Sequence, residues 1–325
     1  MKIDIQCVNY PLHEAFATAR DSLQVVPVIV VTLTDSQGRS GRGEAAGVDY
    51  AGETQSSMRE QIERIAPMLT DSTQPEQLLQ MLPAGGARNA LDCALWDLLA
   101  KRSNSRVWEL LKLAMSPVQT CVTIGLASEA DMRRKTRAAL SYSTLKVKVD
   151  ATQPLATLEW VMSEHPTADI IMDANAAFTR DILKRCLDRL RGTRVRLIEQ
   201  PLPVGAEQAL TGLARTIPLA ADESCVDEHS LQSIVGVYDA INIKLDKCGG
   251  LTAALRLLNT AKALGFTVMV GNMCGSSLAM APAMLIAQQA EWVDLDGPLL
   301  QTEDVADPIR YANGLMALPS RALWG

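Results

Sequence analysis

The feature that most restricts the fold of this chain is a series of eight short, apolar, β-rich segments that alternate with helical segments from about residue 117 onward. A parallel sheet needs such alternation, because each crossover helix returns the chain to the edge where the next strand starts. Eight units predict a parallel α/β barrel, with an open doubly wound sheet as the alternative. The expected strands are residues 119–125, 144–150, 168–173, 194–199, 217–221, 239–244, 267–271 and 291–295.

Residues 1–116 have the pattern of a separate α+β domain in front of a barrel over residues 117–299. The glycine-rich stretch 38–43 lies inside a predicted hairpin and opens no helix, so it is a weak nucleotide-binding signal. The expected elements are strands at residues 2–8 and 25–34, a return strand through Glu44, and helices at residues 54–69, 76–82 and 87–102.

Composition argues against several classes of function. With 31 basic and 37 acidic residues the chain has a formal net charge of −6, and no basic run suggests nucleic acid binding. The longest apolar run, Val25–Val31, contains Pro27 and is far shorter than the ~20 residues that span a bilayer. The alternating N-terminus predicts a strand and not a signal peptide, so we expect a cytoplasmic protein that binds neither nucleic acid nor membrane.

Charged residues recur at the C-terminal ends of the predicted barrel strands. Successive positions are 25, 26, 23 and 22 residues apart, followed by a gap of 50, and this is the period of one strand plus one helix. A strand can simply stop where charge begins, but here six units share the register. In a barrel these ends converge at one mouth, where catalytic residues lie. The residues are Lys148, Asp173, Glu199, Asp222, Lys244 and the pair Asp294 and Asp296.

The second predicted strand carries two lysines on one face. Period-two alternation places Lys146 and Lys148 on the face opposite to Leu145 and Val147. An edge strand would direct the lysines to water, but helices cover the outer face of a barrel strand. We therefore expect both ammonium groups inside the barrel, near anions that offset the cost of their burial.

Five carboxylates at these strand ends suggest two binding sites. Asp173, Glu199 and Asp222 would repel one another strongly unless a cation joined them, and an all-oxygen ligand set favours Mg²⁺. A carboxylate pair for glycoside hydrolysis is the alternative, but the flanking lysines suit proton transfer better. Asp294 and Asp296 share one face and form either a clamp for a substrate ammonium group or a polar strand end.

This set of groups suits removal of a proton next to a carboxylate. The intermediate is an enediolate, whose charge a divalent ion stabilises. A lysine can act as the base when nearby cations and desolvation lower its pKa. Lys148 and Lys244 belong to the second and sixth of eight strands, so they lie on opposite sides of the mouth. One would remove a proton and the other would deliver one to the opposite face, which gives racemisation or epimerisation.

On these residues the chain resembles the muconate-lactonizing subgroup of the enolase superfamily, and within it the L-Ala-D/L-Glu epimerases, also called dipeptide epimerases. The similarity extends over essentially the whole chain, and the Asp-x-Asp on the last strand is typical of dipeptide epimerases. The matching segments are Ala87–Asp92, Lys146–Lys148, Asp173–Asn175, Glu199–Pro201, Ala221–Ser224, Asn242–Lys247 with Gly249 and Gly250, and Asp294–Asp296.

The resemblance implies a modified TIM barrel, (β/α)7β, under a capping domain that the C-terminal tail, residues 300–325, completes. It also implies one Mg²⁺ per subunit and a dipeptide substrate from murein peptide metabolism. Family members often assemble, so a homo-oligomer is compatible with it. The implied roles are metal binding by Asp173, Glu199 and Asp222, acid/base catalysis by Lys148 and Lys244, substrate contacts by Lys146 and Thr123, an ammonium clamp by Asp294 and Asp296, and side-chain selection near Asn272.

Substrate preference is less sharply indicated than the reaction. Glu-specific relatives place an arginine in the capping loop at about residues 15–24, where Arg20 is the candidate and Leu23 is the alternative occupant of that position. Arg20 is equally interpretable as a solvated loop residue. Other enzymes of the subgroup share the same ring of charges, namely N-acylamino acid racemase, o-succinylbenzoate synthase and muconate cycloisomerase. A non-catalytic barrel scaffold is the third hypothesis, and the complete set of ligands and lysines argues against it.

Overall fold

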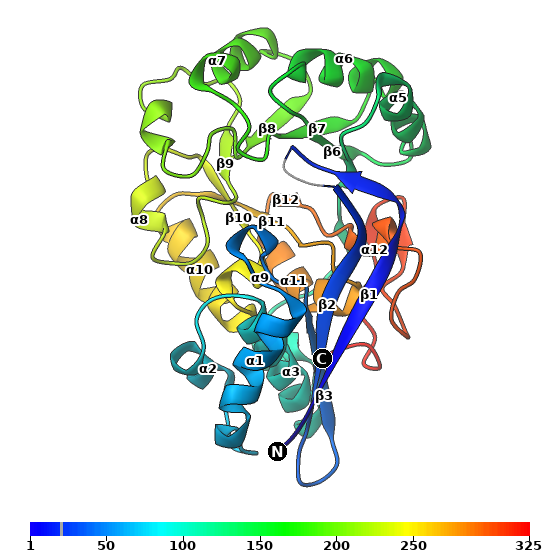
Figure 1. The fold of residues 1–325 in the computed structure, drawn as a ribbon, viewed down its shortest axis with the longest axis vertical. Coiled ribbons are helices and arrows are strands. Elements are labelled where there is room, and N and C mark those ends of the chain that lie inside the picture. The colour runs from blue at the N-terminus through cyan, green and yellow to red at the C-terminus, as the bar shows by residue number, and fades with distance from the viewer. Residues whose placement is uncertain (20–21) are drawn as a thin grey trace.

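The N-terminal residues form a long antiparallel sheet in the computed structural model, which describes residues 1–19 and 22–325 (Figure 1). The strand order is that of the expected meander. Pairing of the first two strands is interrupted between Pro11 and Phe16 and resumes where Phe16 pairs with Leu23. The described part of the expected capping loop therefore includes paired strand residues, and Phe16 and Leu23 line a cavity together with barrel residues. The strands are β1 (Lys2–Ala17), β2 (Ser22–Thr34) and β3 (Ser40–Ala45).

The helices of this region pack on one face of that sheet. Close contact explains the glycine-rich stretch, because a Cβ added at Gly41 would lie 2.3 Å from the Ala94 carbonyl oxygen, and one at Gly43 would lie 2.2 Å from the Ala90 carbonyl oxygen. These glycines let β3 approach the buried helix α3. The helices are α1 (Gln55–Ile65), α2 (Pro75–Met81), α3 (Gly86–Arg102) and the short α4 (Val107–Leu110), which the periodicity does not predict.

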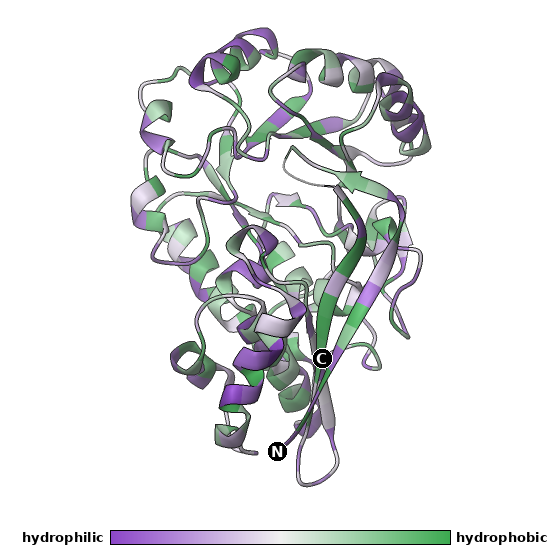
Figure 2. Ribbon diagram, in the orientation of Figure 1, coloured by the Kyte–Doolittle hydropathy of each residue, from purple (hydrophilic) through white to green (hydrophobic). Residues whose placement is uncertain are grey.

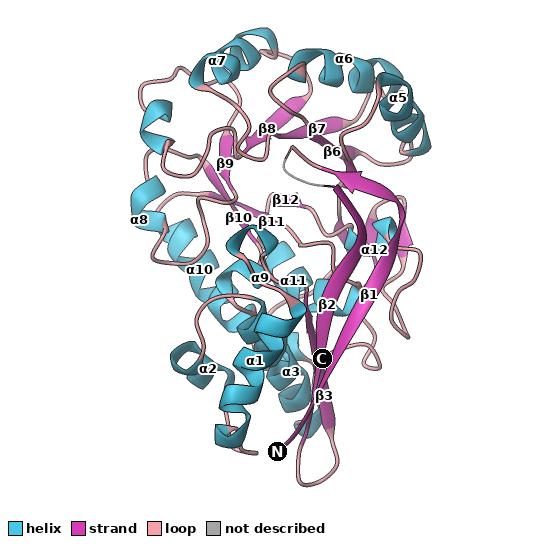
Figure 3. Cartoon of the chain, in the orientation of Figure 1, coloured by secondary structure: helices cyan, strands magenta, loops and turns pink. Residues whose placement is uncertain are grey.

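A curled, fully parallel eight-stranded sheet follows, so the expected fold class, a modified TIM barrel with an α+β cap, is confirmed (Figures 1 and 3). Each of the eight expected barrel strands is present, several of them shorter than expected. They are β5 (Val122–Ile124), β6 (Thr144–Lys148), β7 (Asp169–Asp173), β8 (Val195–Glu199), β9 (Leu219–Ala221), β10 (Ala240–Ile243), β11 (Thr267–Val270) and β12 (Trp292–Val293).

Helices surround this sheet and give it a dry outer face. Figure 3 shows α5, α6 and α7 outside β6, β7 and β8, and Figure 2 shows that α5 and α7 carry many hydrophilic residues. None of the described helices is both long and apolar enough to cross a bilayer. The helices are α5 (Glu129–Ala138), α6 (Pro154–Glu164), α7 (Arg180–Arg189), α8 (Leu231–Ile234), α9 (Leu245–Cys248), α10 (Leu251–Ala263), α11 (Ser277–Ala287) and α12 (Gly297–Leu300).

The first and last barrel strands meet at a seam that uses side chains. The Cys121 backbone N–H donates to the Val293 carbonyl oxygen at 2.9 Å, and the Leu295 N–H donates to Thr120 Oγ1 at 2.9 Å. The Thr123 N–H donates to a carboxylate oxygen of Asp296 at 2.6 Å. At this seam β5 and β12 are too short to pair along their backbones, so side chains accept hydrogen bonds that backbone carbonyl groups accept elsewhere in the sheet.

The C-terminal tail returns to the first domain. Part of it forms a small antiparallel sheet, in which β14 pairs with β13 on one side and with β4 on the other. Further on, Trp324 Nε1 donates to the Cys93 carbonyl oxygen in α3, and the Gly325 N–H donates to Asp97. The strands of this sheet are β4 (Val118–Gln119), β13 (Tyr311–Ala312) and β14 (Leu315–Met316).

Candidate active site

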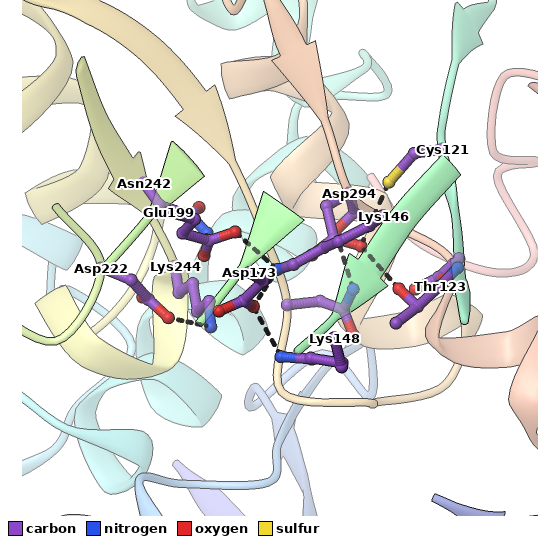
Figure 4. Close-up of polar contacts among 12 residues, drawn as sticks. Cys121, Thr123, Lys146, Lys148, Asp173, Glu199, Asp222, Asn242, Lys244 and Asp294 are labelled. Atoms are coloured by element: carbon purple, nitrogen blue, oxygen red, sulfur yellow. Dashed lines mark hydrogen bonds and ion pairs between the residues drawn. The ribbon is translucent and has the colours of Figure 1, made fainter. Parts of the chain in front are cut away.

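The two lysines of β6 point into the barrel, as the alternation predicts. Lys146 and Lys148 are 2% and 7% exposed, whereas Leu145 and Val147 are fully buried in the core between the sheet and its helices. The cost of burying two ammonium groups is offset by carboxylates on neighbouring strands. Figure 4 shows these acidic and basic side chains converging from different strands.

The acidic residues of β7 and β8 lie beside Lys148 in the parallel ladder. Lys148 is paired with Asp173, and Asp173 is paired with Glu199, so the recurrent spacing in the sequence places all three at one level of the barrel. Asp222 directly follows β9 and is also buried. Lys148 Nζ lies 2.6 Å from Asp173 Oδ2.

Lys146 lies between acids on both sides. Its Nζ is 2.8 Å from Asp294 Oδ2, 2.9 Å from Glu199 Oε2 and 3.1 Å from Asp173 Oδ2. Burial alone lowers the pKa of Lys146, but the surrounding carboxylates, Asp294 first, outweigh it and hold the pKa well above its usual range. Lys146 is therefore positively charged as these side chains stand.

Lys244 lies across the barrel from Lys146 and Lys148. It follows β10, four strands from β6 in the sheet order, and its Nζ lies 2.8 Å from Asp222 Oδ2. Burial lowers the pKa of Lys244, but the charge of Asp222 outweighs this effect and raises the pKa above its usual range. Lys244 keeps its proton as long as the charge of Asp222 is directed at it.

Lys247 and Asn242 belong to the same cluster, although sequence reasoning assigned them no role. Lys247 Nζ donates to Asp222 Oδ1 at 2.6 Å and to the Asn242 carbonyl oxygen at 2.9 Å, so it holds the second oxygen of Asp222. Asn242 Nδ2 donates to Glu199 Oε1 at 2.7 Å. The spacing in the sequence could have indicated the position of Lys247, because residues three positions apart on a helix lie on the same face and Lys247 is three positions after Lys244.

Asp294 and Asp296 follow β12 and, together with Thr123, line a small pocket that Lys146 and Lys148 also line. Asp294 Oδ1 lies 3.5 Å from Thr123 Oγ1, and its other oxygen binds Lys146. Burial, together with the charge of Asp294, raises the pKa of Asp296 to about 7. This acidic corner can accept hydrogen bonds from an ammonium group of a ligand.

A cavity between the first domain and the barrel mouth contains both candidate bases. Lys148 and Lys244 line it on the barrel side, and Phe16 and Leu23 line it on the hairpin side. Asn272 also lines the cavity, and its amide donates to the Asp294 carbonyl oxygen at 2.7 Å. The remaining wall includes Val26, Pro27, Ala46, Asp49, Glu53, Asn175, Met273 and Cys274. Arg20, the candidate for side-chain recognition, lies outside the described residues.

The three acids at the strand ends suit a divalent cation by their chemistry. All three are carboxylates, and the buried Glu199 Oε2 has the Lys146 ammonium at 2.9 Å but accepts no well-aligned hydrogen bond. Burial and the charge of Asp173 raise the pKa of Glu199 to about 7, although the charge of Lys146 opposes the shift. In this structure lysine ammonium groups lie between the acids. Among the described residues, no three His, Cys, Asp or Glu side chains are arranged to hold a metal ion. A cation would take over carboxylate contacts that the lysines now make.

Two family models match the chain. The N-terminal domain of the mandelate racemase / muconate lactonizing enzyme family matches residues 1–112, and the enolase C-terminal domain-like family matches residues 126–322. Over 302 residues the chain is 40% identical to an N-acetyl-D-glutamate racemase of Pseudoalteromonas sp, covering 92% of this chain and 95% of the relative. Over 313 residues it is 36% identical to the L-Ala-D/L-Glu epimerase of Escherichia coli K12, and the match covers 95% of this chain and 97% of the relative.

Solved structures agree with these matches. An enolase family member from Agrobacterium tumefaciens with homology to dipeptide epimerases, bound to sodium and L-Ala-L-Glu, is 37% identical, with a TM-score of 0.96 over 99% of each chain. A dipeptide epimerase from Methylococcus capsulatus, complexed with Mg and L-Arg-D-Lys, is 27% identical, with a TM-score of 0.89 over 98% of this chain and 97% of the other. The expected family is thereby confirmed: the chain belongs to the mandelate racemase / muconate lactonizing enzyme branch of the enolase superfamily.

Proposed function

We propose that this chain is an isomerase, a Mg²⁺-dependent dipeptide epimerase that inverts the α-carbon of the C-terminal residue of its substrate. The observation that carries the proposal is that Lys148 and Lys244 come from strands four positions apart in the sheet and line one cavity. Two bases on opposite sides of a bound carbon atom are what inversion by proton transfer requires. The names of the relatives support this class of reaction.

In this proposal the acidic and basic groups have separate tasks. Asp173, Glu199 and Asp222 hold one Mg²⁺ per subunit, which when bound stabilises the charge that develops on the substrate carboxylate. Lys148 and Lys244 exchange protons with the two faces of the α-carbon, through an enediolate. The pKa of Lys244 falls towards a useful range when the charge of Asp222 is satisfied by another cation. Lys146 stays charged and faces the substrate carboxylate.

The acidic corner orients the other end of the substrate. Asp294 and Asp296 accept hydrogen bonds from the dipeptide's ammonium group, beside Thr123. Asn272 lies next to this corner and contributes to the wall that faces the substrate. Recognition of a glutamate side chain by Arg20 is part of the proposal.

We place the enzyme in the cytoplasm, in the turnover of murein peptides, and allow for a homo-oligomer. We also propose that residues 1–116 and the tail 300–325 form the cap and that residues 117–299 form the catalytic barrel. The bonds of Trp324 and Gly325 to α3 support the assignment of the tail.

Incubation of the protein with L-Ala-L-Glu and a library of L,L-dipeptides in D₂O, with Mg²⁺, tests the proposal. We expect deuterium at the α-carbon of the second residue and a new diastereomer, followed by NMR and chiral chromatography. No exchange with any dipeptide would exclude the proposed reaction. A calorimetric titration with Mg²⁺ tests the scaffold hypothesis separately, because a scaffold need not bind the metal.

Racemisation of an N-acylated amino acid is the second candidate, favoured by the 40% identity to an N-acetyl-D-glutamate racemase. Such a substrate has no ammonium group for the acidic corner. Asp296→Asn distinguishes the two, because its amide oxygen can still accept the bond from the Thr123 N–H while the charge is lost. A dipeptide epimerase should lose turnover through a raised KM, whereas N-acetyl-L-glutamate turnover should be spared. Unchanged dipeptide kinetics would contradict the assigned clamp.

A further inference from the structure

The loops that follow β7, β8 and β9 each begin at a proposed metal ligand, and all three meet at one residue, Gln200. The Gln200 backbone N–H donates to the Ala220 carbonyl oxygen at 2.8 Å, and the Gln200 carbonyl oxygen accepts from the Ala176 N–H at 2.8 Å. The main chain of Gln200 therefore contacts both neighbours of β8, namely the loop after β7 and strand β9.

The side-chain amide of Gln200 extends this connection to the loop that carries Asp222. Gln200 Oε1 accepts from the Asp222 N–H at 2.9 Å and from the Ser224 N–H at 3.1 Å. Gln200 Nε2 donates to the Leu202 carbonyl oxygen and to Ser224 Oγ, both at 2.8 Å, and more weakly to Tyr238 at 3.3 Å. The amide is fully buried, and two N–H donors on one side with a carbonyl acceptor on the other fix its orientation.

The backbone around this contact is in an unusual conformation. Gln200 has φ of +36°, and Asn175 and Ala176 in the preceding loop have φ of +42° and +64°. Left-handed conformations at non-glycine residues cost on the order of 1–3 kcal/mol each, and they persist where surrounding bonds hold them. Three such residues adjoin the proposed metal ligands, so the bonds of Gln200 hold a strained arrangement at the functional site.

We infer that Gln200 is a positioning residue: its amide fixes the backbone of residues 222–224 and so directs the Asp222 carboxylate towards Asp173 and Glu199. The inference rests on the proposed function, because it concerns the same Mg²⁺ site. Lys247 holds one oxygen of the Asp222 side chain, and Gln200 holds the backbone from which that side chain starts. The Asp222 side chain is thus held both at its carboxylate and at its backbone before any ligand binds.

The test measures the affinity for Mg²⁺ by calorimetry, without substrate, in three variants whose folding is checked by circular dichroism and thermal melting. Gln200→Met keeps the side-chain length but removes every amide bond, and we expect Mg²⁺ affinity to fall about 10–100-fold. Gln200→Asn shortens the side chain by one methylene group, withdraws the amide oxygen from the Asp222 and Ser224 N–H groups, and should lower Mg²⁺ affinity in the same direction. Tyr238→Phe removes only the weakest contact and serves as the matched control.

Activity gives a second readout that a purely structural role would not change. Added Mg²⁺ should restore kcat of folded Gln200→Met towards the wild-type value, because the defect lies in metal affinity. Wild-type Mg²⁺ affinity in folded Gln200→Met would overturn the inference. If Gln200→Met does not fold, Gln200→Asn decides, since wild-type Mg²⁺ affinity in folded Gln200→Asn would contradict the role given to Oε1. Absence of Mg²⁺ binding by the wild type itself would instead remove the proposed function and this inference with it.

Discussion

Lys148 and Lys244 each contact one carboxylate and come from opposite parts of the barrel, so their roles can be separated by substitution. Lys148→Ala and Lys244→Ala each retain one base. We expect inversion of a dipeptide to fall by about 10²–10⁴-fold in each, with deuterium exchange retained for only one epimer, and for a different epimer in each variant. Chiral chromatography and NMR in D₂O measure both quantities.

Lys184→Ala is the matched control, because Lys184 is exposed on α7 and should leave both rates unchanged. Wild-type inversion in either active-site variant would exclude the two-base scheme.

Asp222 is a proposed metal ligand whose two carboxylate oxygens contact Lys244 and Lys247. Asp222→Asn removes one anionic oxygen ligand, and we expect Mg²⁺ affinity to fall by at least about tenfold in a calorimetric titration. The exposed Asp188→Asn changes the net charge equally and should bind Mg²⁺ as the wild type does. Equal affinities in the two variants would show that the ligand assignment is wrong.

At the scale of single elements, helix α11 begins where two acids from different parts of the chain bind its first N–H groups. Glu44, in β3, accepts from the Ser276 N–H at 2.7 Å, and Asp304, in the tail, accepts from the Ser277 N–H at 2.9 Å. Negative groups are favourable at a helix N-terminus. This helix therefore joins the N-terminal sheet and the tail to the barrel.

Glu44 makes the stability of that junction depend on pH. Burial raises the pKa of Glu44 from 4.5 to about 7, although bonds from Ser276 oppose the shift. Between these values the unfolded chain has released the proton while the folded chain keeps it, so the contribution of Glu44 to stability falls as pH rises through this window and is constant above it.

Glu44→Gln should remove this part of the pH dependence. Relative to the wild type, the free energy of unfolding of Glu44→Gln should increase by up to about 3 kcal/mol from about pH 4.5 to about pH 7. Urea unfolding across that range measures it. Glu159→Gln, on the exposed side of α6, is the control, and a parallel pH profile for Glu44→Gln and the wild type would refute the expectation.

The seam between β5 and β12 gives a second prediction at this scale. Thr120→Val leaves the buried Leu295 N–H without its acceptor, so we expect the free energy of unfolding to fall by about 1–3 kcal/mol. The control is Thr136→Val, because the Thr136 hydroxyl is equally buried but donates only to the Met132 carbonyl oxygen within α5. Equal losses in urea unfolding would argue against a special role of the seam.

At the scale of the whole molecule, the architecture could be predicted because its causes are local. Buried parallel strands need apolar runs separated by helices, and charged residues can enter a barrel only at its ends. The register of Lys148, Asp173 and Glu199 in the sequence is the register of the ladder. The family follows from the same residues.

Features that depend on contacts between distant segments could not be predicted. The split of the first expected barrel strand into β4 and β5 depends on pairing with β14 in the tail. The bond of Asp296 to the Thr123 N–H arises because β12 is too short to supply a backbone partner. The network around Gln200 joins three loops, and no spacing in the sequence indicates it.

The position of Asp296 links recognition to folding. One carboxylate both closes the barrel and forms half of the proposed ammonium clamp. Laboratory evolution towards substrates without an amino group would therefore be constrained, because a replacement without an acceptor at this position loses the bond to the Thr123 N–H together with the old specificity. Asparagine, which keeps an acceptor for the same N–H, is the change from which such an evolutionary route would start.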